Sequence, residues 1–384
     1  MVLATGTAVY AAPAVESDNV VRRATADDGV AEALLDRLAS TGEQAGAEFS
    51  WRRFFATTRP SGERTLPVDQ THDSVVVGDA AVVKWMVEAG PTPAPVLVAQ
   101  LAAGGFSEMP RPWGFVSWVG GDDDVVVAAV SDYLPGASDG WSWCVADVSA
   151  FAVGQEELSA ALPPVTILGG LVARMHLALA TPSDVMPQPV ERADASMVAS
   201  WRTRALSLLD DAIASVSGAE GERLRRRGSR IREVLDDLSV AETPVMRVHG
   251  DLHVGQVLRW DGGYAVNDFD GNPVLSPAER LLPSSPARDV AGMVQSLDHV
   301  GRVVIGRVAD ADASRAGQWI GAAQRAFLGA YREQLATANR SELFDPRLLD
   351  AFRAEQECRE FLYAERHLPR WRYVPDAALA AMFP

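Results

Sequence analysis

The chain has 384 residues, a formal net charge of −16, 48% hydrophobic residues and 22% charged residues. This composition is typical of a soluble globular protein, and the length is enough for two lobes rather than one domain. The acidic balance argues against a nucleic-acid partner, because phosphate backbones favour surfaces rich in lysine and arginine.

The cysteines and the N-terminus bear on the cellular compartment. Cys144 and Cys358 lie far apart without metal-type spacing, so neither a disulfide framework nor a zinc site is indicated, and we expect a cytoplasmic protein. Residues 1–14 are small and apolar, but no basic residue precedes Arg22, and we predict a strand there rather than a leader. No apolar run approaches the roughly 20 residues that a membrane span needs, so we expect no membrane partner.

The first third of the chain has mainly strand patterns. An amphipathic helix follows the capping pair Asp27 and Asp28 within the first 66 residues. After it we predict a hairpin, a helix and two strands joined by a turn at 120–123; their ranges are 74–86, 95–103, 113–119 and 124–131.

Beyond residue 136 the hydrophobic pattern is mostly that of helices. Strands are expected only within 244–270, and helices at 163–180, 195–215, 219–238, 286–298, 311–336 and 346–368. The arginine-rich segment 219–238 has the pattern of a solvated helix face. The order predicts an α+β fold of the bilobal protein-kinase kind, divided into an N-terminal cap subdomain, a β-rich N-lobe and a helical C-lobe at 1–66, 67–132 and 133–384.

A short segment around Asp251 carries the chemistry of phosphoryl transfer. Asp251 lies on a tight loop between apolar runs, Gln256 follows five residues later, and Asp268 follows seventeen residues later. Phosphoryl transfer needs one carboxylate that orients and deprotonates a hydroxyl, and an amide oxygen and a carboxylate that hold Mg²⁺ against the nucleotide phosphates. We therefore predict Asp251 as the base and Gln256 and Asp268 as metal ligands.

Two neighbours of these residues have more than one interpretation. Asp270 can contribute to the metal site or stabilise its loop, and we include it among the predicted ligands. His253 can contact the substrate, although a loop histidine paired with backbone groups is the plainer explanation. Arg288 and Asp289, at the start of a helix, are expected to be a structural pair that fixes the catalytic loop rather than reacts.

The predicted nucleotide site lies in the first third of the chain. Lys84 ends an apolar strand and points inward, where a lysine needs an anion such as the α- and β-phosphates. The preceding turn has no glycine, so phosphate cover is expected from backbone N–H groups and the hydroxyls of Thr71 and Ser74. Adenine is expected at the backbone of the hinge, which we place at Asp132 and Leu134.

The C-terminal helix has the residue types of a sugar pocket. Carboxylates and amides bind hydroxyls or an ammonium group, and aromatic rings stack on sugar faces. The alternative is an amphipathic surface helix with an aromatic end. The candidate substrate residues, in addition to Asp251 and His253, are Gln356, Glu357, Glu360 and Trp371.

These segments together resemble the aminoglycoside phosphotransferase-like kinases, in particular the branch of maltokinases and bacterial glucosamine kinases. The resemblance runs from about residue 69 to residue 375. It rests on Gln70–Gly78 with Lys84, Asp139-Gly140-Trp141, His249–Gln256, Asp268–Pro273, Glu279-Arg280 and Ser285–Met293. It implies a kinase-like fold, ATP with Mg²⁺, and the same roles for Asp251, Gln256 and Asp268.

The C-terminal motif decides between the sugars. Gln356–Ala364 followed by Leu368–Trp371 is more similar to glucosamine kinases than to maltokinases. We therefore expect ATP-dependent phosphorylation of glucosamine at its 6-hydroxyl. The alternatives are a maltokinase, an aminoglycoside phosphotransferase and a pseudokinase scaffold. Two features favour the last: the turn before Lys84 has no glycine, and helix 95–103 has no glutamate for Lys84, with only Gln100 and Glu88 near.

Overall fold

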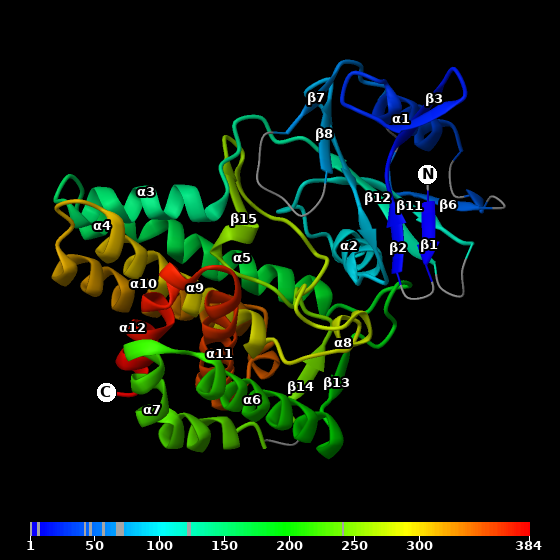
Figure 1. Cartoon of the computed structure of the whole chain (residues 1–384). Coiled ribbons are helices and arrows are strands. Elements are labelled where there is room, and N and C mark those ends of the chain that lie inside the picture. Colours follow the sequence, from blue (N-terminus) through cyan, green and yellow to red (C-terminus); the bar gives the residue numbers. More distant parts are fainter. Residues whose placement is uncertain are drawn as a thin grey trace. The chain divides into compact units, whose positions relative to one another are not determined.

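A computed structural model describes the chain apart from residues 1, 6–7, 42–43, 46–47, 56–57, 67–72, 121–123 and 240–241. The chain forms two compact units (Figure 1). The first unit contains residues 1–102, 107–137 and 260–282, and the second contains residues 103–106, 138–259 and 283–384. The finer division at residues 66 and 132 stays a prediction.

The first unit is built on a seven-stranded sheet with the order β5-β6-β11-β12-β9-β8-β7. Its strands are β5 (Gln44–Ala45), β6 (Phe49–Arg53), β7 (Glu63–Thr65), β8 (Asp73–Val77), β9 (Ala81–Trp85), β11 (Pro112–Trp118) and β12 (Val125–Asp132). All neighbours are antiparallel, and Lys84 pairs with Ser74 on one side and Ala129 on the other. The predicted hairpin and the two later strands are confirmed; residues 121–123 of the turn lie outside the described part.

Smaller elements complete the first unit. Two further sheets contain β1 (Val2–Thr5), β2 (Ala8–Ala11) and β10 (Glu88–Ala89), and β3 (Ala14–Ser17) with β4 (Val20–Arg23). The other elements are α1 (Val30–Thr41), α2 (Ala94–Ala103), β16 (Gly263–Val266) and α8 (Pro277–Arg280). The two predicted helices are confirmed. The single strand predicted over residues 1–14 is wrong, because the segment folds back and satisfies its backbone groups within the β1–β2 pair.

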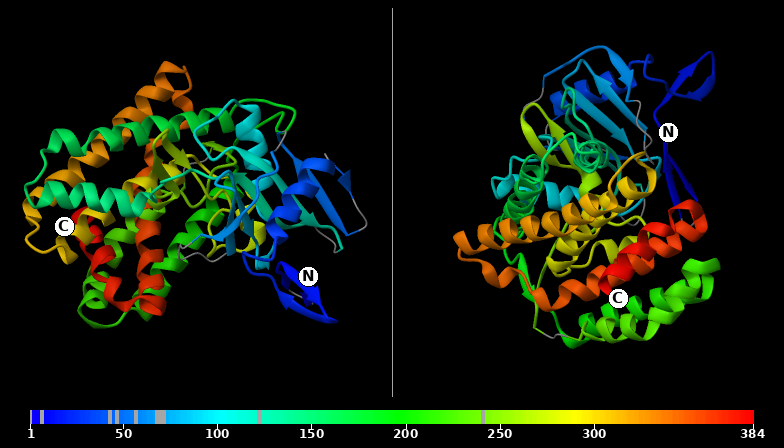
Figure 2. Two further views of the ribbon diagram at one scale, coloured as in Figure 1. Left: turned by 90° about the horizontal axis from the view of Figure 1, so that it is seen from above. Right: turned by 90° about the vertical axis from the view of Figure 1, so that its left-hand side faces the viewer.

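The second unit is mostly helical. Its longer helices are α3 (Gly140–Ala152), α5 (Pro163–Leu179), α6 (Ala195–Ser215), α7 (Gly218–Asp236), α9 (Ala287–Arg307), α10 (Ala313–Thr337), α11 (Leu349–His367) and α12 (Tyr373–Met382). Shorter elements are α4 (Leu158–Ala161), η1 (Val254–Gln256), η2 (Ser341–Leu343), η3 (Pro346–Leu348), η4 (Pro369–Trp371), β13 (Val190–Arg192), β14 (Pro244–Met246) and β15 (Val257–Trp260). Helix α9 packs against α3, α10 and α11, and Figure 2 shows these helices from two further sides.

The six predicted helices of this unit are present, with three corrections. Helix α9 continues to Arg307, well past the predicted end at 298. Helices α3 and α12 were not predicted. Strand β13 lies outside 244–270, so the prediction that strands occur only there is wrong. Its three residues gain their strand partners from β14, which no local pattern could indicate.

One apolar segment needs a correction to the membrane prediction. Residues Leu158–Leu179 are long and apolar enough to cross a bilayer by length and composition. Half of that window is buried inside the structure, and α5 packs along α10. A buried core helix meets the same criterion, and the packing of α5 against α10 is that of a core helix.

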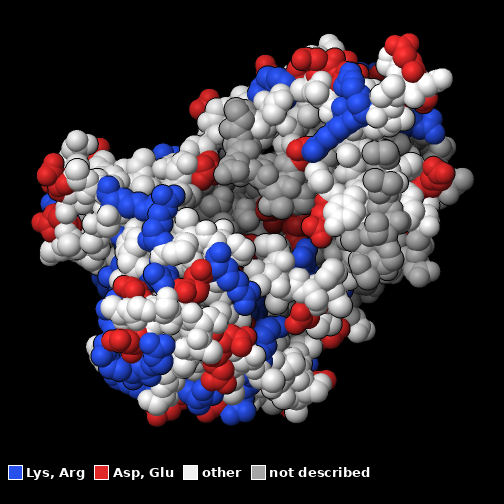
Figure 3. All heavy atoms as spheres, viewed as in Figure 1, with Lys and Arg blue, Asp and Glu red and all other residues white. Residues whose placement is uncertain are grey.

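The arginine-rich helix α7 forms the predicted solvated face. Figure 3 shows basic side chains gathered over the region that α7 occupies in Figure 1. Several are paired with acids: Arg223 and Arg227 contact Asp376, and Arg232 contacts Asp210. These acids offset part of the positive charge of α7 in a chain whose net charge is −16.

Gly140 allows helix α3 to begin against the loop that follows Asp251. Asp139 caps the helix by accepting hydrogen bonds from Ser142 N and Oγ at 3.0 and 2.6 Å. A Cβ atom at residue 140 would lie 1.6 Å from the carbonyl oxygen of Val254 and 2.8 Å from that of Val257. Only glycine fits this approach, which accounts for its place in the Asp139-Gly140-Trp141 motif.

We expect Gly140→Ala to lower the free energy of unfolding by about 1–3 kcal/mol or more, because the methyl group forces α3 away from η1. The matched control is Gly317→Ala in the exposed part of α10, where no atom lies within 4 Å of the added Cβ. The control should gain about 1 kcal/mol from helix propensity. Urea unfolding measures both. Equal effects of the two substitutions would contradict the close packing.

Candidate active site

A buried carboxylate holds the loop that carries Asp251. Asp289, in the first turn of α9, accepts hydrogen bonds from the backbone N–H of His249 at 2.8 Å and of Gly250 at 2.9 Å. The loop turns at Gly250, whose φ of +84° favours glycine. The prediction that Arg288 and Asp289 fix this loop is confirmed for Asp289, whereas Arg288 binds Ser284 and Glu355 instead.

Asp289 also binds His176, which in turn binds Tyr331. The sequence did not single out either side chain. His176 Nε2 lies 3.1 Å from Asp289 Oδ2, and His176 Nδ1 lies 2.8 Å from the Tyr331 hydroxyl. We assign the proton to Nε2, so that Nδ1 accepts from Tyr331. Burial alone raises the pKa of Asp289, but the hydrogen bonds from His176 and from the Gly250 N–H act against it, and the net shift of that pKa is downward. The carboxylate is therefore kept ionised as an acceptor.

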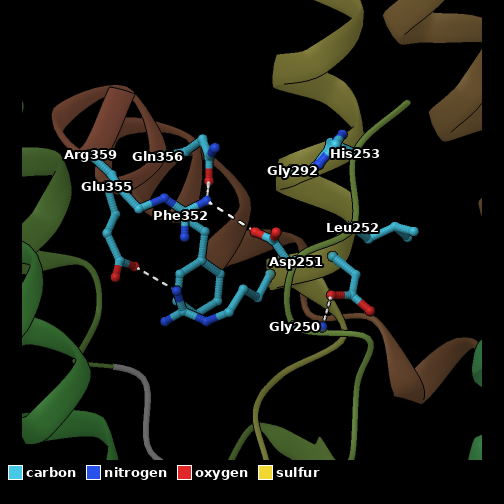
Figure 4. Close-up of a pocket in the computed structure, with 11 residues that line it drawn as sticks. Gly250, Asp251, Leu252, His253, Gly292, Phe352, Glu355, Gln356 and Arg359 are labelled. Carbon is cyan, nitrogen blue, oxygen red and sulfur yellow. Dashed lines mark hydrogen bonds and ion pairs between the residues drawn. The ribbon is translucent and has the colours of Figure 1, made fainter. Parts of the chain in front are cut away.

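Asp251 lines a pocket within the second unit (Figure 4). The space among its lining residues is about 430 Å³, which includes solvent at its open mouth. Its walls come from the catalytic loop, the start of α9 and α11. The lining residues are Gly250, Asp251, Leu252, His253, Arg288, Asp289, Gly292, Phe352, Glu355, Gln356 and Arg359. Three predicted site residues, Asp251, His253 and Gln356, thus share one pocket.

The polar wall opposite Asp251 was only partly predicted. Glu355 accepts from Arg288 Nη1 at 3.0 Å and from Arg204 Nε at 3.3 Å, and the Arg288 guanidinium lies over the Phe352 ring at 4.3 Å. Burial alone raises the pKa of Glu355, but the two arginines lower it. The sequence signal for this wall was the helical spacing, since residues 352, 355, 356 and 359 fall on one face of α11.

Gln256 is the last residue of the short helix η1, which begins three residues after Asp251. His253 caps it, with Nδ1 accepting from the Gly255 N–H at 3.1 Å, and the Gln256 N–H binds the His253 carbonyl at 3.0 Å. Burial lowers the pKa of His253, against the charge of Asp251, so the ring is neutral and can accept this bond. The backbone-paired role of His253 is therefore observed, and its contact with substrate stays a prediction.

The other predicted sugar residues of α11 differ in their surroundings. Glu360 Oε1 accepts from Gln356 Nε2 at 3.1 Å, so it is connected to the pocket through Gln356. Glu357 is fully buried and does not line the pocket. Its Oε1 accepts from His299 Nε2 at 2.7 Å and from Gln295. A role for Glu357 in sugar binding stays a prediction, and its observed contacts join α11 to α9.

Trp371 lies next to this buried pair. Its ring centroid is 5.6 Å from that of Trp141 and 6.5 Å from that of His299, and the Arg307 guanidinium lies over it at 5.3 Å. Trp141 belongs to the Asp139-Gly140-Trp141 motif, so that motif and the C-terminal motif meet in the structure. Stacking of Trp371 on a sugar stays a prediction.

The first unit holds the remaining charged candidates together. Lys84 Nζ lies 2.8 Å from Asp268 Oδ1 and 2.7 Å from Asp270 Oδ2, and Asp270 also accepts from Thr92 Oγ1 at 2.9 Å. Burial alone lowers the pKa of Lys84, but the charges of Asp270 and Asp268 outweigh it and raise that pKa. The observed carboxylate partners of Lys84 are therefore two aspartates from outside helix 95–103.

The backbone at Asp268 has a φ of +65°, in the left-handed region that Asp and Asn adopt more readily than most other non-glycine residues. No group of three or more His, Cys, Asp or Glu side chains suited to a metal occurs among the described residues. Two carboxylates fit Mg²⁺, which commonly takes one or two of them and completes its shell with water and nucleotide phosphates.

The other predicted nucleotide residues are placed as follows. Ser74 is buried in β8 beside Lys84, whereas Thr71 lies outside the described residues. Asp132 ends β12, where its carboxylate accepts from Trp113 Nε1 at 2.6 Å and its N–H binds the Arg111 carbonyl at 2.8 Å. Leu134 follows and is half-buried. Their contacts with nucleotide stay predictions.

Comparison with known proteins agrees with this geometry. No protein-family model matches the chain. A glucosamine kinase of Streptacidiphilus jiangxiensis is 50% identical over 370 residues, which cover 95% of this chain and 83% of that protein. The chain belongs to the glucosamine kinase family. A second member, the glucosamine kinase of Mycolicibacterium smegmatis, is 44% identical over 96% of this chain and 91% of its own length.

A solved glucosamine kinase has the same fold. It is 47% identical to this chain, covers 98% of this chain and 88% of its own, and superposes with a TM-score of 0.87. That structure is a complex with glucosamine, ADP and inorganic phosphate. The α+β, protein-kinase-like fold class predicted from the sequence is confirmed, and so is the predicted family.

The buried pair of His299 and Glu357 makes stability depend on pH. Burial alone lowers the pKa of His299, but Glu357, with smaller effects of Glu360 and Asp298, raises it to about 9. An unfolded histidine has a pKa of about 6.5. The stabilisation from this proton is therefore fully present below about pH 6.5 and is lost as the pH rises to about 9.

We expect His299→Gln to remove part of the stability loss that the parent protein shows between about pH 7 and pH 9.5, by up to about 3 kcal/mol. Urea unfolding at several pH values measures the slope. The matched control, His367→Gln in the exposed last turn of α11, should keep the parental slope. The same slope in His299→Gln and the parent would refute the buried ion pair.

Proposed function

We propose that the chain transfers the γ-phosphoryl group of ATP to the 6-hydroxyl of glucosamine in the cytoplasm. The observation that carries this proposal is the pocket in which Asp251 and Gln356 lie together in a chain that is 50% identical to a glucosamine kinase. The complex of the related enzyme with glucosamine, ADP and inorganic phosphate supports both the sugar and the nucleotide.

Asp251 is the proposed base. It accepts the proton of the 6-hydroxyl while the oxygen attacks the γ-phosphorus and the bond to the bridging oxygen of ADP breaks. Asp289 holds the loop so that this carboxylate does not have to be ordered when the sugar binds. Gln356 and Glu360 are proposed to bind the sugar, and Trp371 to stack on it. Glu357 is proposed to support these residues through its buried contacts with α9. His253 is proposed to contact the substrate through Nε2, because its Nδ1 caps η1.

Lys84, Asp268 and Asp270 are proposed to exchange partners when the nucleotide binds. The Lys84 ammonium contacts both carboxylates, so that one positive charge faces two negative charges. Nucleotide phosphates are the natural new partners of Lys84, and Asp268, Gln256 and Asp270 are then available as ligands for Mg²⁺. The bound Mg²⁺ supplies positive charge at the transferring phosphate. Ser74 and Thr71 are proposed as phosphate donors, and the backbone at Asp132 and Leu134 as the adenine site.

A coupled ADP-release assay over a sugar panel tests the proposal. We expect turnover of glucosamine in the presence of Mg²⁺, and little turnover of maltose or of aminoglycosides. Removal of Mg²⁺ by a chelator should abolish turnover. Preferential turnover of maltose would contradict the proposed substrate. Thermal stabilisation by ATP without turnover of any sugar would indicate a scaffold instead of an enzyme.

We expect Asp251→Asn to lower kcat for glucosamine by about 10²–10⁴-fold, since an amide cannot accept the hydroxyl proton. The KM for ATP should stay near its parental value, because the nucleotide candidates lie elsewhere in the chain. Asp261→Asn, at an exposed position between β15 and β16, is the matched control and should be fully active. Parental turnover by the Asp251→Asn enzyme would exclude Asp251 as the base.

A further inference from the structure

A second charged side chain faces Asp251 within the pocket. Arg359, on α11, places its Nη2 atom 3.8 Å from Asp251 Oδ1, and both side chains are about four-fifths buried. Figure 4 shows the guanidinium of Arg359 directed at the Asp251 carboxylate from the opposite wall. A cation at this position attracts an anion that enters the pocket.

The contact between Arg359 and Asp251 differs from the other ion pairs of this unit. Arg347 binds Asp345 with two hydrogen bonds of 2.7 and 2.9 Å, and Arg288 binds Glu355 at 3.0 Å. The separation of 3.8 Å is too long for a hydrogen bond. Arg359 therefore balances the charge of Asp251 without occupying its lone pairs, which leaves the carboxylate able to accept a proton.

The position of Arg359 is set by its own helix. Its guanidinium donates to Gln356 Oε1, one turn earlier, and Gln356 Nε2 in turn donates to Glu360. A guanidinium has five N–H donors in a fixed plane, so this bond orients the remaining donors. The same helix thus connects the proposed sugar residues with a cation that faces the proposed base.

The other cation of the pocket, Arg288, is bound to other residues. Arg288 donates to Glu355 and to Ser284 Oγ at 3.1 Å, and it stacks on Phe352. Burial lowers the pKa of Arg288, against the charge of Glu355, which indicates a guanidinium with little contact with water. Among the described residues that line the pocket, Arg359 is the cation that lies nearest to Asp251.

We propose that Arg359 is a catalytic residue that pairs with the transferred phosphoryl group. This inference rests on the proposed phosphorylation of glucosamine. When the 6-hydroxyl proton moves to Asp251, that carboxylate becomes neutral and Arg359 loses its counter-charge. At the same moment the new O–P bond brings a phosphoryl group with negative oxygens to the pocket, and the bond to ADP breaks. The guanidinium then stabilises this phosphoryl group in the transition state and in the product.

The test compares Arg359→Gln, Arg359→Lys and, as a matched control, Arg366→Gln at an exposed position of the same helix. We expect Arg359→Gln to lower kcat by about 10²–10³-fold, as losses of charge-stabilising groups do. Arg359→Lys should recover part of the loss, and Arg366→Gln should be fully active. The KM for ATP should change by less than about three-fold, since uniform binding is not affected.

Product binding provides a readout that a purely structural residue would not change. Isothermal titration should show that Arg359→Gln loses at least about ten-fold more affinity for glucosamine 6-phosphate than for glucosamine, relative to the parent. A loss for glucosamine arises only through the bond from Arg359 to Gln356. Equal loss of affinity for both ligands, or a parental kcat, would overturn the proposal. If the parent enzyme itself does not turn over glucosamine, the proposed function fails first, and this outcome is distinct from a failure of Arg359 alone.

Discussion

The carboxylate of Asp289 is the constraint on which the candidate site depends. It binds two consecutive backbone N–H groups of the catalytic loop and is itself held by the buried pair His176 and Tyr331. Two charge-assisted hydrogen bonds at one turn fix the direction in which the next residue, Asp251, projects. Helices α5, α9 and α10 all contribute to this arrangement, so the core of the second unit is connected directly to its proposed chemistry.

In each unit, the acids proposed for metal binding or catalysis lie next to a cation. In the first unit, Lys84 holds Asp268 and Asp270. In the second unit, Arg359 faces Asp251 without bonding to it. In each place one positive charge offsets acid charge. Under the proposed mechanism, each cation turns to phosphate when the acids bind metal or a proton.

The sequence predicted those parts of the structure whose causes are local. The hairpin that ends at Lys84 and the helix α11 follow from hydrophobic periodicity, and the spacing of Asp251 and Gln256 follows from a short loop. Contacts between distant segments could not be predicted in this way. The partner of Lys84 comes from almost two hundred residues later in the chain, and His176 reaches Asp289 from another helix. The buried state of Glu357 also needed the structure, because an amphipathic pattern does not say which polar residue meets a partner inside.

The most direct test of this account is the exchange rate of the His249 and Gly250 amide hydrogens in an Asp289→Asn variant, followed by mass spectrometry together with kcat. The substituted amide keeps the shape but loses the charge, and hydrogen bonds to a charged acceptor contribute about 1.5–3 kcal/mol. We predict exchange about ten-fold faster or more at these two amides, unchanged exchange in α10, and a lowered kcat with a near-parental KM for ATP. Parental exchange at both amides together with parental turnover would contradict the claim that this carboxylate organises the site.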